Sequence, residues 1–383
     1  MRDFCIKTLN QREILIELKN IGFDEHYIGN VSGKYKYINL KIFKLSVPQA
    51  NFLKQTALSV GTDCAVNKNV LTNKVDYSDC ILGGSISQIR QIINKLRAQP
   101  FSMSILADKL ENFIGNYEYK LSKIVGILNL TADSFSDGGL YNNFESAVRH
   151  LHELIEDGAD IIDIGAESTK PYSKEVGADE QLSKLEPVLK YICERNIKIP
   201  ISIDTRSSIV AKRVCDYGVS IINDVSGFDY DENMINVVAE TGVKTIIQHS
   251  LGTPENMQDN PEYNNLVDDI YLSLNKKIES ALNKGIQKEN IIIDVGIGFG
   301  KTKEQNFELI KRIDEFKSLG CEIMLGISRK SFLDMKNASN EEKDIYTLAL
   351  NTLAIERKVD YLRVHNVKLH KKLIELMGNF KEI

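Results

Sequence analysis

A polar, glycine-containing run follows an apolar segment about one third of the way along the chain. Residues 124–128 are apolar, and the polar groups that follow are Asn129, Thr131, Asp133, Ser134, Ser136 and Asp137, before Gly138 and Gly139. Such a run at the end of a strand presents hydrogen-bonding groups to a ligand, and the glycines allow the loop to bend. An ordinary polar turn has a similar composition, so the rest of the chain must decide between the two interpretations.

Apolar segments followed by polar groups recur along the chain after this point. The eight segments are 124–128, 160–164, 200–203, 220–222, 244–248, 290–293, 322–325 and 360–364. Helical apolar spacing separates them, so eight strand-then-helix units over about 260 residues predict an α/β fold, a (β/α)8 TIM barrel. A doubly wound open sheet is the alternative. In a barrel the groups that follow the strands share one face, which marks the active face.

Oxygen acceptors directly follow three of these strands. Asp204, Asn223 and Asp294 end apolar runs, and carboxylate and amide oxygens suit a heterocycle with several N–H donors, such as a purine- or pterin-like edge. The alternative is structural pairing of the carboxylates with basic residues, for which the candidates are Arg206, Arg329 and Lys330.

Basic residues gather after the last three strands, namely Lys301, Arg329, Lys330, Arg363 and His365. This part of a barrel often binds phosphate, and an Arg fork beside a His suits an anion. The pattern predicts a basic wall beside the heterocycle. Glycines 296, 298 and 300 do not have phosphate-loop spacing; we expect them to let the backbone approach a flat ligand, with Phe299 offering a ring face.

Residues 1–118 do not follow the eightfold pattern. Strand-like stretches at 37–45 and 80–82 and helical stretches at 11–21, 48–59 and 87–98 indicate a smaller α+β domain ahead of a barrel at 119–383. Two glycines before Ser85 are compatible with a phosphate site at a helix N-terminus. A glycine-rich turn with a serine cap is the favoured interpretation.

The composition excludes several classes of protein. The 383 residues are 43% hydrophobic and 26% charged, which is ordinary for a globular protein, and no apolar run approaches the roughly 20 residues of a membrane span. The N-terminus lacks an apolar signal segment, which predicts a cytoplasmic protein. A net charge of −5 argues against nucleic-acid binding. Six scattered cysteines predict reduced, mostly buried thiols, without zinc or disulfides.

Residues from about 122 to 380 resemble the dihydropteroate synthase family of pterin-binding barrels. The motifs that carry the resemblance are Gly126-Ile-Leu-Asn-Leu-Thr-x-Asp-Ser-Phe-Ser-Asp-Gly-Gly139, Asp163-Ile-Gly-x-Glu-Ser-Thr169, Ser202-Ile-Asp-Thr205, Ile222-Asn-Asp-Val225, Gly298-Phe-Gly-Lys301, Ser328-Arg-Lys-Ser331 and Arg363-Val-His365. The resemblance implies condensation of 6-hydroxymethyl-7,8-dihydropterin diphosphate with p-aminobenzoate, which gives 7,8-dihydropteroate and diphosphate in folate biosynthesis.

The resemblance also implies a role for each site residue. The pterin would be held by Asp204, Asn223, Asp294 and Lys330. The diphosphate would be held by Asn129, Arg363 and His365, with Asn129 also reaching a Mg²⁺ ion. The p-aminobenzoate side would be formed by Thr169, Lys170, Pro171, Phe299 and Ser331. Asp133, in the loop after the first strand, would steady the reacting centre or orient the metal, and the family implies a homodimer.

The chain departs from the family pattern at Ala132, Ala166, Lys170, Ser250 and Val295. Lys170 keeps a charge but loses the planar fork of an arginine, and Ala132 loosens the backbone where the first loop begins. Two alternatives therefore stay open: a methyltetrahydrofolate–corrinoid methyltransferase, against which the basic motifs argue, and a non-catalytic pterin-binding paralogue.

Overall fold

The computed structural model describes residues 6–7, 9, 14–114, 121–130, 140–167, 175–251, 262–333 and 338–382. The chain divides into two compact units, Met1–Glu118 and Tyr119–Ile383. Each unit has its own hydrophobic core, one built around Leu53 and Leu82 and the other around Leu128 and Phe316.

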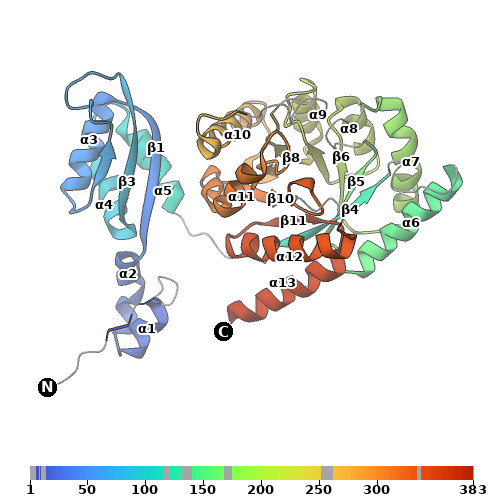
Figure 1. Cartoon of the computed structure of the whole chain (residues 1–383). Helices are drawn as coiled ribbons and strands as arrows, with labels where there is room; N and C mark the ends of the chain where they lie inside the picture. Colours follow the sequence, from blue (N-terminus) through green and yellow to red (C-terminus); the bar gives the residue numbers. More distant parts are fainter. Residues whose placement is uncertain are drawn as a thin grey trace. The chain divides into compact units, whose positions relative to one another are not determined.

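The second unit is a closed barrel of eight parallel strands in its described residues (Figure 1). The strands are β4 (Lys123–Asn129), β5 (Ile161–Gly165), β6 (Ile201–Asp204), β7 (Ile221–Asp224), β8 (Lys244–Gln248), β9 (Ile291–Asp294), β10 (Glu322–Leu325) and β11 (Tyr361–Val364). They pair in chain order, and β11 closes the barrel against β4. The TIM-barrel prediction is confirmed, the open-sheet alternative is wrong, and each end of a predicted strand lies within two residues of the observed end.

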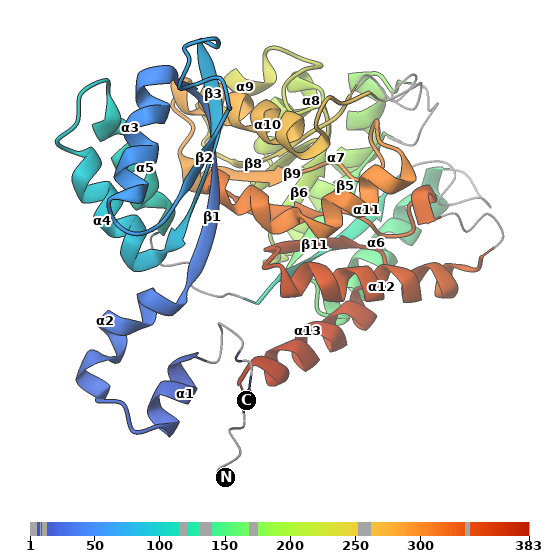
Figure 2. The ribbon, with the colours of Figure 1, turned by 60° about the vertical axis from the view of Figure 1, so that its left-hand side comes forward.

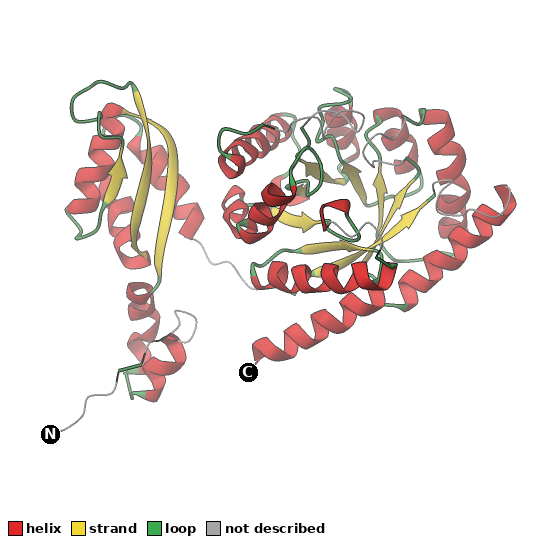
Figure 3. Cartoon of the chain, viewed as in Figure 1, coloured by secondary structure: helices red, strands yellow, loops and turns green. Residues whose placement is uncertain are grey.

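Helices surround these strands, as two views of the ribbon show (Figures 2 and 3). They are α6 (Leu140–Glu156), α7 (Ala178–Glu194), α8 (Ser208–Cys215), α9 (Met234–Thr241), α10 (Leu266–Asn283), α11 (Lys303–Lys311), α12 (Asn340–Glu356) and α13 (Val367–Glu382), with 3-10 turns η2 (Lys288–Asn290), η3 (Ile313–Leu319) and η4 (Ser331–Leu333). Alternate strand residues such as Ile162 and Ile203 pack against the apolar helix faces. Burial on both sides explains why the strands are continuous apolar runs.

The first unit contains a three-stranded antiparallel sheet in the order β1-β3-β2. Its strands are β1 (Tyr37–Ser46), β2 (Cys64–Val66) and β3 (Tyr77–Ser85), and its helices are α1 (Ile14–Asn20), α2 (Glu25–Tyr35), α3 (Val47–Leu58), α4 (Ile86–Leu96) and α5 (Met103–Ile114). The sequence patterns predict β1, β3, α1, α3 and α4. They miss α2, β2 and α5.

Helix α4 begins at an ordinary serine cap. The Ser85 hydroxyl accepts a hydrogen bond from the Gln88 backbone N–H at 3.3 Å, and the Gln88 side chain accepts one from the Ser85 N–H at 2.9 Å. This reciprocal capping box satisfies two N–H groups at the helix start. The favoured interpretation of the glycine-rich turn is therefore confirmed.

The cysteines among the described residues are all free thiols. Cys64, Cys80 and Cys321 are buried, whereas Cys193 is exposed. Among the described residues, no helix is both long enough and apolar enough to cross a lipid bilayer.

Candidate functional site

The interior of the barrel changes from apolar to polar along the strands. One cluster takes a residue from each of seven strands: Val125, Ile161, Ile221, Ile246, Ile292, Met324 and Tyr361. Side chains two positions further along a strand face the same way, and those positions hold Ile127, Asp163, Asn223, Gln248, Asp294, Gly326 and Arg363. The alternation of strand side chains thus places polar groups together inside the C-terminal end of the barrel.

The ends of four neighbouring strands lie at one level. The backbone register pairs Asn129 with Gly165, Gly165 with Asp204, and Asp204 with Asn223. A Cβ atom built on Gly165 would lie 3.5 Å from the Asp204 Cβ and 3.6 Å from the Asn129 Oδ1. Glycine therefore leaves room between the amide on β4 and the carboxylate on β6.

Arg363 on β11 connects the last strand of the barrel to carboxylates on β5 and β6. Its Nε donates to the Asp163 Oδ2 at 2.6 Å, and its Nη2 donates to the Asp204 Oδ2 at 2.8 Å. Asn223 Nδ2 donates to the same Asp163 oxygen at 3.1 Å. The Asp163 Oδ1 and the Asn223 Oδ1 are buried and have no hydrogen-bond partner among the described residues. Buried acceptors without partners are uncommon, so this pair suits a ligand that brings N–H donors.

Asp163 is the interior residue that the sequence analysis did not assign to the site. It lies in the middle of β5 and is fully buried, whereas the assigned carboxylates stand at strand ends. A charged residue inside an otherwise apolar strand was the available signal, because such a charge must find a partner when it is buried. Its partners come from other strands: Asn223 stands on β7, and Arg363 stands on β11, the last strand of the barrel.

A second group of site residues surrounds Asp294 at the end of β9. The Asp294 Oδ1 accepts a hydrogen bond from the Gly296 N–H at 2.7 Å. Lys330 lies over the Phe299 ring with its Nζ 4.2 Å from the centroid, and it donates to the Ile297 carbonyl. Gly296 has a φ of 69°, and a Cβ there would lie 1.9 Å from the His249 carbonyl oxygen. The loop therefore requires glycine at this position.

Burial changes the charges available in the site. It raises the pKa of Asp204 to about 7, although the Arg363 guanidinium acts in the opposite direction. Burial also raises the pKa of Asp294, against the effect of Lys330, and it lowers the pKa of Lys330 to about 8, against the effect of Asp294. Displaced pKa values are common at functional sites because clefts exclude water around charged groups.

His365 follows β11 and faces the loop after β10. Its Nδ1 lies 2.9 Å from the Ser328 Oγ, which also accepts a hydrogen bond from the His365 N–H at 3.2 Å. Burial lowers the pKa of His365 to about 3, with Arg329 and Arg363 acting in the same direction. The imidazole is therefore neutral near pH 7. A bound anion would act against these cations and raise its pKa.

The predicted basic wall is smaller than the sequence pattern suggests. The buried Lys301 Nζ lies 2.8 Å from the Phe299 carbonyl oxygen and 3.1 Å from the His249 Nδ1. Arg329 forms a bidentate ion pair with Asp344. Lys301 and Arg329 therefore have protein partners. Arg363, Lys330 and His365 have protein partners too, but Arg363 and Lys330 also stand beside the buried carboxylates Asp204 and Asp294.

For Asp204, the structural-pairing alternative involves a basic residue other than the three candidates. Asp204 pairs with Arg363 rather than with Arg206. Arg206 pairs with Glu167, with Nη2 and Oε1 separated by 2.8 Å, and its guanidinium lies 4.1 Å from the centre of the Tyr230 ring. Arg206 and Glu167 are both buried.

Several predicted site residues lie outside the described residues, namely Asp133, Thr169, Lys170 and Pro171. Ala132, one of the departures from the family pattern, lies outside them as well. Of the other departures, Ala166 and Val295 are buried in the barrel core. Ser331 is exposed at the start of η4, and Asn129 is half-buried at the end of β4.

Comparison with known proteins assigns this site to a family. A sequence profile described as "Pterin binding enzyme" matches residues 125–365. A dihydropteroate synthase of Clostridium beijerinckii is 42% identical over 259 residues, which are 66% of this chain and 93% of that protein. The chain belongs to the dihydropteroate synthase family. The synthase is therefore a transferase of folate biosynthesis that condenses 6-hydroxymethyl-7,8-dihydropterin diphosphate with p-aminobenzoate to give 7,8-dihydropteroate and diphosphate.

A solved structure supports the same membership. The dihydropteroate synthase of Clostridium difficile, crystallised in the presence of pteroic acid, is 38% identical and has a TM-score of 0.64. The match covers 69% of the synthase described here and 99% of the crystallised chain. Membership of this family favours a synthase over the corrinoid methyltransferase alternative.

The N-terminal unit has a counterpart in a larger protein. A probable bifunctional folylpolyglutamate synthase/dihydropteroate synthase of Haloferax volcanii is 32% identical over 343 residues. The match covers 83% of this synthase, which is more than the unit Tyr119–Ile383 contains, so it includes part of Met1–Glu118. This chain spans 40% of the length of the Haloferax protein.

Proposed function

We propose that the polar end of the barrel has a pterin side and a diphosphate side that meet at Arg363. The observation that carries this proposal is the pair of buried, unpartnered oxygens, Asp163 Oδ1 and Asn223 Oδ1, beside the Arg363–Asp204 ion pair. The acceptors match the N–H groups of a pterin edge, and the guanidinium matches an oxyanion. The pterin diphosphate carries N–H donors and an oxyanion, so this one substrate provides partners for the buried oxygens and for the guanidinium.

On the pterin side we assign Asp204, Asn223, Asp294 and Lys330, and the buried Asp163 lies beside Asn223 as a further acceptor. The carboxylates and the amide are each at most 6% exposed, so a ligand that enters hydrogen-bonds to them away from competing water. Lys330 is held over the Phe299 ring. It is therefore placed to donate to a ring nitrogen or carbonyl of the pterin while Phe299 contributes an apolar wall.

On the diphosphate side we assign Asn129, Arg363 and His365. When the bond between the pterin methylene carbon and the diphosphate oxygen breaks, the diphosphate takes the electron pair. Fixed donors placed where this charge develops stabilise the transition state more than the ground state. The amine nitrogen of p-aminobenzoate then forms the new C–N bond and loses a proton. Phe299, Ser331, Thr169, Lys170 and Pro171 are proposed for the p-aminobenzoate side, and Asp133 for steadying the reacting centre.

Asn129 is the proposed protein ligand of a Mg²⁺ ion. Among the described residues, no group of three or more His, Cys, Asp or Glu side chains could hold a metal. Mg²⁺ commonly takes most of its ligands from substrate phosphates and water, and needs few protein oxygens. The half-buried Asn129 amide at the end of β4 fits that requirement. When bound, the ion would neutralise charge on the diphosphate.

Replacing Asn129 by alanine tests both the metal and the diphosphate assignment. We expect the Mg²⁺ concentration for half-maximal activity to rise on the order of tenfold, because one metal ligand is lost, and chelation to abolish the activity of the unaltered enzyme. Diphosphate release is measured across a Mg²⁺ titration. Asn275→Ala, an amide on the surface of α10, is the matched control. An unchanged Mg²⁺ requirement in Asn129→Ala would remove Asn129 from the metal site.

We also infer that the synthase is a homodimer in the cytoplasm. The resemblance to the dihydropteroate synthase family supports this proposal. Sedimentation velocity with the 43.2 kDa chain should give twice the monomer mass, and a monomeric mass at micromolar concentration would contradict the dimer.

A further inference from the structure

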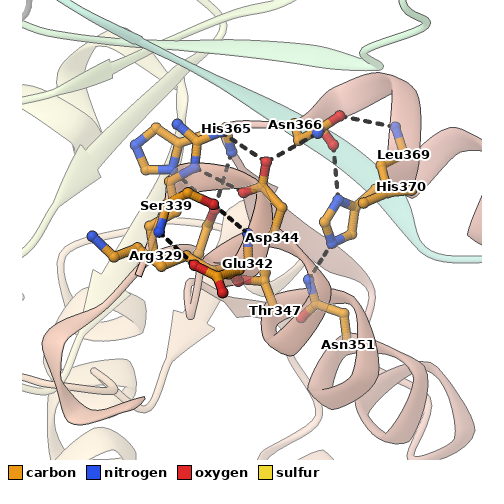
Figure 4. A network of polar contacts seen from close by, with 12 residues as sticks. Arg329, Ser339, Glu342, Asp344, Thr347, Asn351, His365, Asn366, Leu369 and His370 are labelled. Carbon is orange, nitrogen blue, oxygen red and sulfur yellow. Dashed lines mark hydrogen bonds and ion pairs between the residues drawn. The ribbon is translucent and has the colours of Figure 1, made fainter. Parts of the chain in front are cut away.

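Helix α12 carries a buried carboxylate that contacts two loops of the active face (Figure 4). Asp344 is 3% exposed and lies in the first turns of the helix, away from any strand end. Its carboxylate points toward the loop after β10 and the loop after β11. A buried charge at such a place requires partners that satisfy it, and both loops supply them.

The loop after β10 supplies Arg329. Its Nε donates to the Asp344 Oδ1 at 2.7 Å, and its Nη2 donates to the Asp344 Oδ2 at 2.8 Å. Bidentate pairing fixes the direction of the guanidinium as well as its distance. The next residue in the chain is Lys330, which the proposed function places against the pterin.

The backbone at Arg329 has an unusual conformation that the same helix maintains. Its φ is 58°, in the left-handed region that a residue with a Cβ rarely adopts. The Arg329 N–H donates to the Thr347 Oγ at 3.3 Å, and Thr347 is fully buried on α12. A strained backbone persists only where its surroundings fix it. Here α12 fixes both the side chain and the backbone of Arg329. The direction in which the side chain of the next residue, Lys330, projects is fixed as a consequence.

The loop after β11 supplies Asn366. Its Nδ2 donates to the Asp344 Oδ2 at 3.0 Å, and its carbonyl oxygen lies 2.8 Å from the His370 Nδ1. The preceding residue, His365, contacts Ser328 in the other loop. Asp344 is therefore a carboxylate shared by the two loops that carry Lys330 and His365 (Figure 4).

The electrostatics of Asp344 favour the ionised form. Burial alone would raise its pKa, but the hydrogen bonds from Arg329 and Asn366 together outweigh burial and lower the pKa below its usual value. The carboxylate is therefore charged throughout the range in which an enzyme works. Its negative charge compensates Arg329, which stands close to His365 and lowers the pKa of that imidazole.

We propose that Asp344 is a positioning residue of the synthase reaction, which holds the loops after β10 and β11 so that Lys330 and His365 meet the pterin diphosphate. This inference rests on the proposed roles of those two residues. Asp344 does not itself contact the substrate. It acts through Arg329 and Asn366.

Asp344→Asn tests the inference, because it keeps the shape of the side chain and removes the charge and one acceptor. We expect kcat/KM for the pterin diphosphate to fall on the order of tenfold, as for the loss of charge-assisted hydrogen bonds. Glu341→Gln, at an exposed position of the same helix, is the matched control and should retain full activity. Arg329→Lys keeps the charge but loses the fork, and should reproduce the loss even if Asp344→Asn folds poorly.

A double-mutant cycle separates positioning from general destabilisation. If Asp344 acts partly by placing Lys330, adding Asp344→Asn to Lys330→Ala should cause clearly less than the loss that Asp344→Asn causes alone, because coupled residues are not additive. Losses that multiply fully in the double variant would overturn the inference, and so would full activity in both Asp344→Asn and Arg329→Lys. Unchanged kinetics in Lys330→Ala alone would instead overturn the proposed site, and the inference with it.

Discussion

Replacing Arg363 by alanine is expected to lower kcat/KM for the pterin diphosphate by roughly 100- to 1,000-fold, the range seen when a fixed donor to a developing oxyanion is removed. The structure adds a second reason. Arg363 also pairs with Asp163 and Asp204, and its loss leaves two buried carboxylates without their cation. Steady-state kinetics measure the first effect, and the midpoint of thermal unfolding measures the second.

The Arg363 result is interpretable when two ligands are compared. Binding of 6-hydroxymethyl-7,8-dihydropterin, which lacks the diphosphate, should weaken far less than use of the diphosphate substrate. Arg213→Ala removes an arginine that pairs with Glu186 and Asp216 on the surface, and it should leave both ligands unaffected. Equal losses for the two ligands in Arg363→Ala would indicate general misfolding and would argue against a diphosphate role.

Asp204→Asn is expected to weaken pterin binding on the order of tenfold or more, because a carboxylate that accepts hydrogen bonds becomes a mixed donor and acceptor. Isothermal titration with the pterin measures the change. Asp216→Asn, an exposed carboxylate on the surface, is the control. Unchanged affinity in Asp204→Asn would mean that the carboxylate serves only to hold Arg363.

The pH dependence of the same titration gives a second readout. Burial raises the pKa of Asp204 to about 7, so the group is protonated below that pH and a carboxylate above it. Affinity for the pterin should therefore fall as the pH falls through 7, and it should fall again above about pH 8 as Lys330 loses its proton. Asp204→Asn should flatten the acidic limb, apart from the contribution of Asp294, and keep the alkaline limb.

The barrel was predictable from the sequence because its signal is local. Strands covered on both faces are continuous apolar runs, and runs such as 244–248 and 322–325 match β8 and β10 at both ends. The N-terminal unit was predicted less completely. Strand β2 has three residues, and α2 has a weakly apolar sequence with Gly29 and Gly33 inside it. Neither segment shows a clear hydrophobic periodicity.

The site was predictable only where its residues stand at strand ends. Asp204, Asn223 and Asp294 could be found in this way, whereas Asp163 lies inside a strand and Asp344 on a helix. A charge pattern also cannot show which cation already has a partner. The sequence pattern places Arg329 in a basic wall, but in the fold Arg329 pairs with Asp344. Tertiary structure determines such ion pairs between residues that are distant in the sequence.

The measurement that tests the account most directly is diphosphate release by the purified full-length chain, with Mg²⁺ and the pterin diphosphate, in the presence and absence of p-aminobenzoate. A dihydropteroate synthase with the proposed site should release diphosphate and form 7,8-dihydropteroate in equal amounts, and only when p-aminobenzoate is present. Tight binding of the pterin diphosphate without turnover would contradict the account and favour a non-catalytic pterin-binding paralogue, provided that a cooperative thermal unfolding transition shows that the chain is folded.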